Sequence, residues 1–279
     1  MTTTPKVAIG IDIGGTGIKG ALVDVESGEL VSDRIKVATP RGGEPDDIVR
    51  EVAAMVERFG DATGDVPVGV CFPAVVLHGR TMSAANVSKR WIGLDAEGLF
   101  ERALGRDIVF VNDADAAGVA EAYFGAAKDK AGLVIVTTLG TGIGSAFLYD
   151  GVLVPNTELG HLEVGGRDAE RRASFAAKER GRLSWARWAK RLQRYYSHVE
   201  MLFSPELFVV GGGVSKNADL FLPLLKLRTP IVPAKLRNNA GILGSAWLAA
   251  RHAAGQVDVQ MFRSGEVLDK TADTKAHDR

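Results

Sequence analysis

Polar side chains that can do chemistry stand where predicted strands end. Asp113 follows an apolar run at 108–111 and Asn112, which puts its carboxylate at the carboxyl end of a short buried strand. In α/β folds this end opens into the ligand crevice, where a carboxylate can accept the proton of a hydroxyl group that attacks phosphorus. Two other interpretations stay open, because Asp113 can cap the following helix and Asp115 offers a second carboxylate.

A second polar group lies in the segment 156–161. Glu158 and His161 stand close together there, and with Asn86 and Asn112 they offer the acceptors and bidentate donors that a polyhydroxylated ligand requires. Such sites discriminate strongly, because an unpaired buried polar group is costly. A lone histidine is more often structural, so His161 is a candidate only as part of this group.

One phrase, Gly-Thr-Gly-Ile, occurs twice, at 15–18 and at 140–143. Each copy lies between a β-rich run and a second apolar run, which predicts a β-hairpin. Glycine permits positive φ and close backbone approach, and exposed amides with a threonine hydroxyl suit phosphate oxygens. One such turn is usually only a tight turn, and neither copy is a P-loop or a dinucleotide fingerprint. The matched pair predicts two similar domains that face one phosphate chain.

Two positively charged features accompany these turns. Lys19 lies just past the first turn, where it can reach a phosphate as a point charge or stay exposed on a strand. The segment 167–194 carries ten basic residues against three acidic ones. Such an excess attracts a long polyanion or forms a solvated helix face, and the sequence leaves both interpretations open.

The composition excludes several classes of function. The chain has 279 residues, with 34 acidic and 34 basic ones, so no overall field indicates a nucleic-acid binder. The single Cys71 excludes an internal disulfide and a cysteine-cluster zinc site, which fits a reducing cytosol. No signal peptide and no run of membrane-spanning length is present. We therefore expect a soluble cytoplasmic protein that binds neither nucleic acid nor membrane.

Strand-like and helix-like segments alternate along the chain, which predicts an α/β fold. Beside the hairpins, predicted strands cover 30–37, 66–72, 108–111 and 207–210, and predicted helices begin after 44–47 and cover 114–124, 185–202 and 238–252. Ser184 is the expected cap of the helix at 185–202, and the aromatic and apolar face of that helix, which ends at Leu202, is expected in the core or in a subunit interface.

The two hairpins predict two related α/β domains around a cleft. We expect an N-terminal domain over 1–112 that is completed by a helix at 238–256, a C-terminal domain over 113–237, and a disordered tail at 259–279.

As an ordered set, these motifs resemble those of the ROK sugar kinases, which belong to the actin-like ATPase superfamily. The runs that carry the resemblance are 10–16, 112–113, 139–142, 158–161 and 211–213, within about residues 7 to 255. Lys19-Gly20 and the run 86–91 resemble the polyphosphate glucokinases within that family.

The resemblance implies two ribonuclease-H-like domains that close over glucose and a phosphoryl donor. It implies Asp113 as the catalytic base and Asp12 near a magnesium ion. The implied sugar contacts are Asn86, Asn112, Asp113, Glu158, His161 and Glu170, and the implied phosphate- or nucleotide-binding residues are Asp12, Gly14, Gly15, Thr16, Gly17, Lys19, Gly140, Thr141, Gly142, Gly211, Gly212 and Gly213. Family members commonly form homodimers. Many also carry a cysteine-rich zinc motif after the 158–161 segment; this chain lacks it, as polyphosphate glucokinases do, so no zinc site is expected.

From the motifs and the resemblance we expect a glucokinase that transfers a phosphoryl group to the 6-hydroxyl of glucose, from inorganic polyphosphate and also from ATP, with Mg²⁺ as cofactor. Two alternatives remain open. One is an ATP-dependent kinase for glucose, mannose or another hexose, and the other is a non-catalytic actin-like nucleotide switch. The polar group at 158–161 disfavours the switch, because binding a nucleotide alone requires no sugar-binding cluster.

Overall fold

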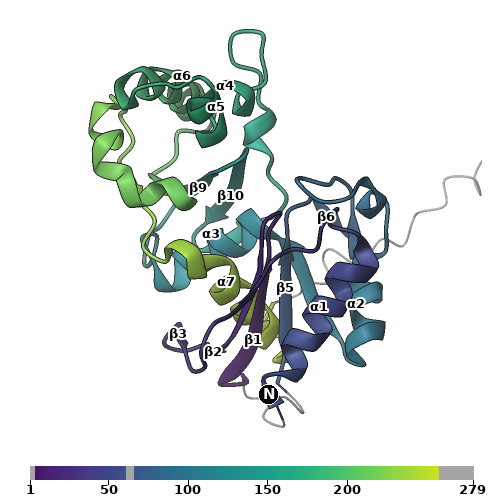
Figure 1. Ribbon diagram of the computed structural model, residues 1–279. Helices are drawn as coiled ribbons and strands as arrows, with labels where there is room; N and C mark the ends of the chain where they lie inside the picture. The colour runs from purple at the N-terminus through teal and green to yellow at the C-terminus, as the bar shows by residue number, and fades with distance from the viewer. Residues whose placement is uncertain (1–3, 61–65, 258–279) are drawn as a thin grey trace, which may run out of the picture.

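Two mixed β-sheets, with helices between and outside them, make up the protein (Figure 1). The computed structural model describes residues 4–60 and 66–257. The α/β class predicted from the sequence is confirmed, whereas the predicted tail at 259–279 lies outside the described residues. None of the helices in the described ranges is both long enough and apolar enough to cross a membrane.

The first sheet joins an antiparallel hairpin to parallel strands, in the order β3-β2-β1-β5-β8 with β4 also paired to β2. Its strands are β1 (Val7–Ile13), β2 (Ile18–Asp24), β3 (Glu29–Leu30), β4 (Ile35–Val37), β5 (Val68–Phe72) and β8 (Ile108–Asn112). The single strand predicted over 30–37 is wrong, because two short strands with a break between them occupy this segment. In the break the hydroxyl of Ser32 accepts the amide hydrogen of Leu22, so a side chain interrupts the backbone ladder.

The second sheet repeats this plan in the order β11-β10-β9-β12-β13. Its strands are β9 (Leu133–Leu139), β10 (Ile143–Tyr149), β11 (Val152–Val154), β12 (Leu207–Gly211) and β13 (Ile231–Pro233). Strands β9 to β11 are antiparallel, and β9, β12 and β13 are parallel. The repeated phrase of the sequence therefore forms the tip of the same hairpin twice, β1–β2 in one sheet and β9–β10 in the other, as predicted.

Helices cover both faces of each sheet. Helices α1 (Pro45–Glu57) and α2 (Ala96–Leu104) pack on the outer face of the first sheet. Helices α3 (Asp113–Phe124) and α7 (Ala240–Ala253) lie on its other face, and α3 also packs on the second sheet (Figure 1). The outer face of the second sheet carries α4 (Glu170–Ala173) and α6 (Trp185–Phe203), and α5 (Phe175–Arg180) lies between these two helices in the chain. Short segments complete the fold: β6 (Val76–Leu77), β7 (Arg80–Thr81) and 3₁₀ turns such as Leu159–His161 and Gly213–Leu220.

The last helix packs closely on the first sheet. A Cβ atom at Gly10 would collide with the carbonyl oxygen of Ile242, and one at Gly69 with that of Ser245, so only glycine permits this approach of α7 to β1 and β5. This contact joins the C-terminal helix to strands of the N-terminal half of the chain. The domain limits at 112 and 237 stay a prediction.

Helix α6 follows the predicted pattern except at its end. The hydroxyl of Ser184 accepts the amide hydrogen of Arg187 and so caps the helix. The buried residues of α6 are Trp188, Ala189, Leu192, Tyr195, Tyr196 and Val199. Leu202 was expected on this face but is 48% exposed, because the last turn presents Phe203 to Phe147 of β10 instead.

Candidate active site

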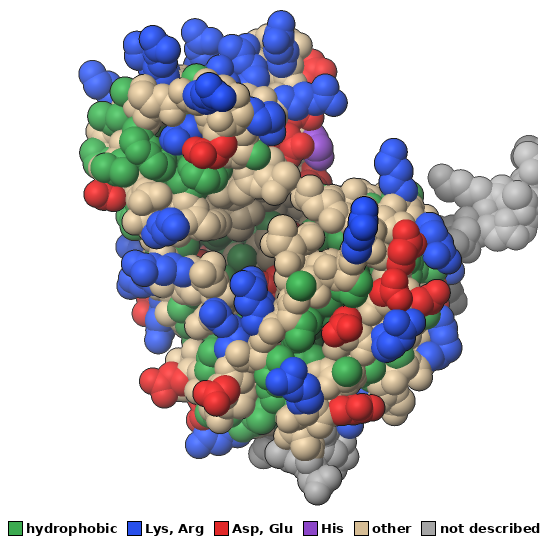
Figure 2. All heavy atoms as spheres, in the orientation of Figure 1, with side chains coloured by type: hydrophobic (Ala, Val, Ile, Leu, Met, Phe, Trp, Pro, Cys, Tyr) green, Lys and Arg blue, Asp and Glu red, His purple; other side chains and the backbone are tan. Residues whose placement is uncertain are grey.

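A large hollow opens between the two halves of the molecule, and Figure 2 shows the surface depressed there. Its volume is about 520 Å³, and we call it the large hollow. Among the residues predicted to form a site, those that line it are Gly14, Gly15, Asn86, Asn112, Asp113, Gly140, Thr141, Gly142, Glu158, His161, Glu170 and Gly212. Segments from both sheets thus meet around one space, as the repeated hairpins predicted.

A second hollow of about 250 Å³, which we call the inner hollow, adjoins the large one and shares Gly14, Asp113 and Gly212 with it. The predicted site residues that line it are Asp12, Gly14, Lys19, Asp113, Gly211, Gly212 and Gly213. Asp113 lines both hollows, so its carboxylate stands where the two spaces meet. A group bound in the inner hollow and one bound in the large hollow would both contact this carboxylate.

The carboxylate of Asp113 has the protonation behaviour of a general base near neutral pH. Withdrawal from water raises its pKa to about 7, with further upward contributions from the charges of Asp12 and Glu158. The ideal catalytic pKa lies near the working pH, because the group must first be ionised and then hold a proton.

The neighbouring Asn112, not Asp113, caps helix α3. Its side-chain oxygen accepts the amide hydrogens of Ala114 and Asp115, at 2.8 and 3.1 Å. Its side-chain nitrogen donates to the carbonyl oxygen of Ala74 at 2.9 Å. The capping role that the sequence left open for Asp113 is therefore filled, and Asn112 keeps a single amide hydrogen for a ligand.

Asp115, the second carboxylate of this run, lies away from both hollows. It is 2% exposed, and one of its oxygens accepts the amide hydrogen of Asn156 at 2.8 Å. Burial raises its pKa to about 8, so it is mostly neutral at neutral pH. Of the two carboxylates that the sequence could not separate, Asp113 alone lines these hollows.

The hairpin turns use glycine for close approach. The expectation of positive φ at these turns is wrong, because none of the glycines at 14–17 or 140–142 has a positive φ. A Cβ atom on Gly15 would lie 2.6 Å from that of Asn86, and one on Gly142 would collide with the carboxylate of Glu170. Asn86 itself has a φ of 63°, in the left-handed region that asparagine tolerates.

Two residues of the first turn lie outside these hollows. Thr16 is exposed at the tip, and Gly17 is buried with its carbonyl oxygen accepting the amide hydrogen of Gly14 at 3.0 Å. Neither residue lines the large or the inner hollow. Their expected phosphate contacts stay a prediction.

An acidic residue that the sequence interpretation missed connects His161 with Glu170. One oxygen of Asp168 lies 2.9 Å from Nδ1 of His161, and the other accepts the amide hydrogen of Glu170 at 3.1 Å. The bond to Asp168 is the main reason why the pKa of His161 is raised. The carboxylate of Glu170 in turn accepts the amide hydrogen of Ile143 at 3.2 Å. Asp168 thus orients the ring of His161, and the Ile143 amide orients the carboxylate of Glu170.

Lys19 and Asp12 form an ion pair at the edge of the inner hollow. The amino group of Lys19 donates to a carboxylate oxygen of Asp12 at 2.8 Å, and the two side chains are only 25% and 17% exposed. The exposed-lysine interpretation of Lys19 is therefore wrong. The second carboxylate oxygen of Asp12 accepts a hydrogen bond from the Cys71 thiol at 3.8 Å. The residues Asp12 and Asp113 line the same hollow, and two carboxylates fit Mg²⁺, because this ion takes one or two carboxylates beside substrate phosphates.

One cluster of metal-ligand types occurs in the described part of the chain. His161, Asp168 and Glu170 have ligand atoms within 4.8 Å of one another, and the cluster contains no cysteine. The carboxylate oxygens of Asp168 already bond to the ring of His161 and to the amide of Glu170. These bonds hold His161 and Glu170 in the wall of the large hollow.

Two sheets of one plan that face a common cleft, with Asp113 lining both hollows of that cleft, are the architecture of the actin-like ATPase class. The chain belongs to the ROK family, whose model matches residues 8–173. The resemblance to the ROK sugar kinases that the sequence indicated is thereby confirmed.

Individual relatives indicate which sugar kinases of the ROK family this chain is similar to. A polyphosphate glucokinase of Mycobacterium tuberculosis is 48% identical over 245 residues, which cover 88% of this chain and 91% of the relative. The crystal structure of an inorganic polyphosphate/ATP-glucomannokinase from an Arthrobacter strain superposes with a TM-score of 0.83 at 54% identity, over 91% of this chain and all of that one. A ROK family glucokinase from Streptomyces griseus, solved with glucose and AMPPNP, gives a TM-score of 0.73 at 26% identity, over 88% and 99% of the two chains.

Proposed function

We propose that this enzyme transfers a phosphoryl group from inorganic polyphosphate, and also from ATP, to the 6-hydroxyl of glucose. The observation that carries the proposal is the position of Asp113 between two hollows of different character. The larger one has a polar wall suited to a sugar, and the inner one has glycine loops and a cation suited to phosphates. The polyphosphate glucokinase and glucomannokinase relatives support the same donor and acceptor, and they favour an enzyme over a nucleotide switch.

In the proposed reaction glucose occupies the large hollow. Its hydroxyl groups bond to Asn86, Asn112, Glu158, His161 and Glu170, whose side chains all line that space. Partial withdrawal from water raises the pKa of Glu158, which favours a carboxyl group able to share a proton with a sugar hydroxyl. Asp113 accepts the proton of the 6-hydroxyl as that oxygen bonds to phosphorus and the bond from phosphorus to the donor oxygen breaks.

The donor occupies the inner hollow and the two hairpin turns. Backbone amides of the turns at 14–17 and 140–142 and the amino group of Lys19 bind its phosphate oxygens, and Gly211–Gly213 borders the adenosine of ATP. Asp12 would hold Mg²⁺, which supplies positive charge to the transferred phosphate group. The chain's part is positioning and the exclusion of water, which supply much of the rate in phosphoryl transfer.

Mannose is a second candidate acceptor. The Arthrobacter relative is a glucomannokinase. A homodimer and a cytoplasmic location, both expected from the sequence, stay predictions.

The test is the formation of glucose 6-phosphate with Mg²⁺, measured with ATP-free polyphosphate and separately with ATP. Product from both donors is the expected result, and a panel of hexoses including mannose defines the acceptor. Product from ATP alone would refute the polyphosphate part, and no product from either donor with any hexose would refute the proposed reaction.

A further inference from the structure

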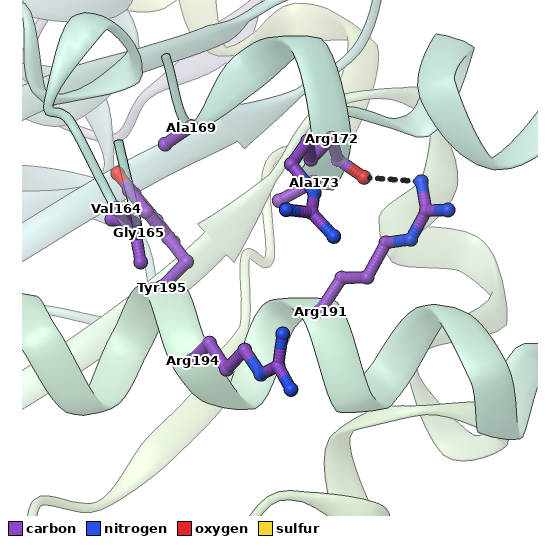
Figure 3. A pocket seen from close by; sticks show the side chains of 8 residues that line it. All are labelled: Val164, Gly165, Ala169, Arg172, Ala173, Arg191, Arg194 and Tyr195. Atoms are coloured by element: carbon purple, nitrogen blue, oxygen red, sulfur yellow. Dashed lines mark hydrogen bonds between the residues drawn. The ribbon is translucent and has the colours of Figure 1, made fainter. Parts of the chain in front are cut away.

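Positive charge gathers on one end of the molecule, away from the cleft. Figure 2 shows Lys and Arg side chains crowded over the end that carries α5 and α6. Within this region α4 and α6 enclose a third hollow of about 140 Å³, the arginine hollow. Arg172 on α4 and Arg191 and Arg194 on α6 line one side of it, and Val164, Gly165, Ala169 and Tyr195 line the other (Figure 3).

These arginines have no acidic partner in the part of the chain that the structure describes. In the ranges 4–60 and 66–257, no arginine of the segment 167–194 has a carboxylate oxygen within 4 Å, whereas Arg50, Arg90 and Arg102 elsewhere each form an ion pair. Arg172 and Arg191 are nevertheless half-buried. Holding like charges together without counter-charges is unfavourable, so the arrangement favours an anion that comes from outside the chain.

The backbone fixes part of this geometry. Arg191 donates from its guanidinium group to the carbonyl oxygen of Arg172 at 3.1 Å, which ties α6 to α4 (Figure 3). Arg172 and Arg194 keep all their guanidinium donors free of partners among the described residues. On the opposite wall the hydroxyl of Tyr195 is buried and has no hydrogen-bond partner among the described residues. The charged groups that line the hollow are all guanidinium groups, which are donors that suit an oxyanion.

Helix α4 connects this hollow to the active site. Glu170 at its start lines the large hollow, and Arg172, two residues later, lines the arginine hollow. The two spaces are thus separated by a single turn of helix, and a helix with its side chains is about 10 Å across. A flexible chain of many phosphates is long enough to pass around the helix from one space to the other.

We propose that Arg172, Arg191 and Arg194 form a distal subsite that binds the inorganic polyphosphate chain beyond the units that react in the cleft. This inference rests on the proposed function and adds where the rest of the donor chain is held. Binding at a second point raises the affinity for long chains through effective concentration and adds nothing for ATP or tripolyphosphate. Free phosphate offers the same oxyanions as the polyphosphate chain, and a comparison of donors of different lengths distinguishes the two ligands.

The test compares two double variants that remove the same charge. Arg172→Gln with Arg194→Gln empties the subsite of two guanidinium groups, and Arg50→Gln with Arg102→Gln is the control on exposed arginines of α1 and α2. Initial rates are measured with long-chain polyphosphate, tripolyphosphate and ATP. We expect the subsite variant to raise the KM for the long chain roughly tenfold, as loss of a second contact point does, with kcat and the other two KM values within about twofold of the control.

Binding is measured as well, so that the subsite is tested even if the enzyme uses no polyphosphate. Long-chain polyphosphate is titrated into the wild-type protein and into the subsite variant by calorimetry at low and high salt. We expect weaker binding and a smaller salt dependence in the variant, because fewer screened contacts remain. An unchanged KM and affinity for the long chain, or an equal loss for tripolyphosphate, would overturn the distal subsite. Binding of the chain without turnover would refute the donor assignment and leave the subsite standing.

Discussion

Replacing Asp113 by asparagine should remove activity and make the fold more stable at neutral pH. The substitution keeps the shape of the side chain but removes both the charge and the ability to accept a proton. Loss of a general base lowers turnover by roughly 10² to 10⁴. The binding of glucose should change little, because the other polar groups of the large hollow stay in place.

The gain in stability follows from the raised pKa of Asp113. In the unfolded chain its pKa is about 3.8 and in the folded protein about 7. Below about pH 4 both states are protonated and the carboxyl group has no effect on the free energy of unfolding. Between these two pKa values the carboxyl group is ionised in the unfolded chain and protonated in the folded protein. The free energy of unfolding therefore falls as the pH rises, and this loss is complete above about pH 7. Three units at about 1.4 kcal/mol each give about 4 kcal/mol as an upper bound, since the hollow admits some water.

Thermal unfolding of the wild type and the variant at about pH 5 and about pH 8 measures this difference. For a chain of this size each kcal/mol shifts Tm by roughly 2–4 °C, so the variant should unfold several degrees higher at the higher pH and by much less at the lower one. Asp115→Asn is the matched control, because its carboxyl group is also buried with a raised pKa but lines neither of these hollows. It should keep most of the turnover.

Two results would refute the reasoning. Substantial turnover in Asp113→Asn would exclude this residue as the proton acceptor. A difference in Tm that is the same at both pH values would show that the carboxyl group ionises in the fold as easily as in the unfolded chain. The pH profile of the wild type gives a third check, because kcat/KM should fall as pH drops below about 7.

Three further changes test the walls of the cleft. Asp168→Asn should lower the pKa of His161 in an NMR titration, because the lost bond is the main cause of its rise, and should raise the KM for glucose more than it lowers kcat; an unmoved titration would contradict this. A Cβ at Gly15 meets the opposite loop at 2.6 Å whereas one at Gly140 meets nothing within 4 Å, so Gly15→Ala but not Gly140→Ala should raise the KM for glucose; equal effects would count against the close approach. Lys19→Met should raise the KM for polyphosphate and for ATP alike, roughly tenfold, since a hydrogen bond to a charged group contributes about 1.5–3 kcal/mol. An effect on one donor only would contradict a shared phosphate contact.

The sequence predicts the parts of this fold that depend on local patterns. The β-rich and apolar runs on either side of the repeated phrase were enough to predict both hairpins, and the spacing of apolar residues predicted α1 and the body of α6. Where a side chain competes with the backbone the prediction failed, as at Ser32, whose hydroxyl interrupts the strand predicted over 30–37. Leu202 failed for a tertiary reason, because the end of α6 turns a different residue toward the sheet.

The site was predictable as a set of residues but not as a geometry. Asp168 escaped notice because an acid seven positions after a histidine has no fixed spatial relation to it in an irregular loop. The glycines of the turns and their close backbone approach were predicted, but their positive φ was wrong and the segments that they approach were not identified. Close approach to Asn86 and Glu170 involves segments distant in the sequence, which no local pattern reports.

The pair Asn112-Asp113 links the stability of a helix to the chemistry of the base. A helix start requires acceptors for its free amides, and a carboxylate that accepts them has its pKa lowered, because the hydrogen bonds favour the charged form. Asn112 accepts two of these amide hydrogens with an uncharged oxygen. The backbone amides of Ala114 and of Asp113 itself still lower the pKa of the Asp113 carboxylate, but withdrawal from water outweighs them and its pKa is raised to about 7. Had the chain placed the acid at the cap position, the same helix would form with a base too weak to accept a proton at neutral pH.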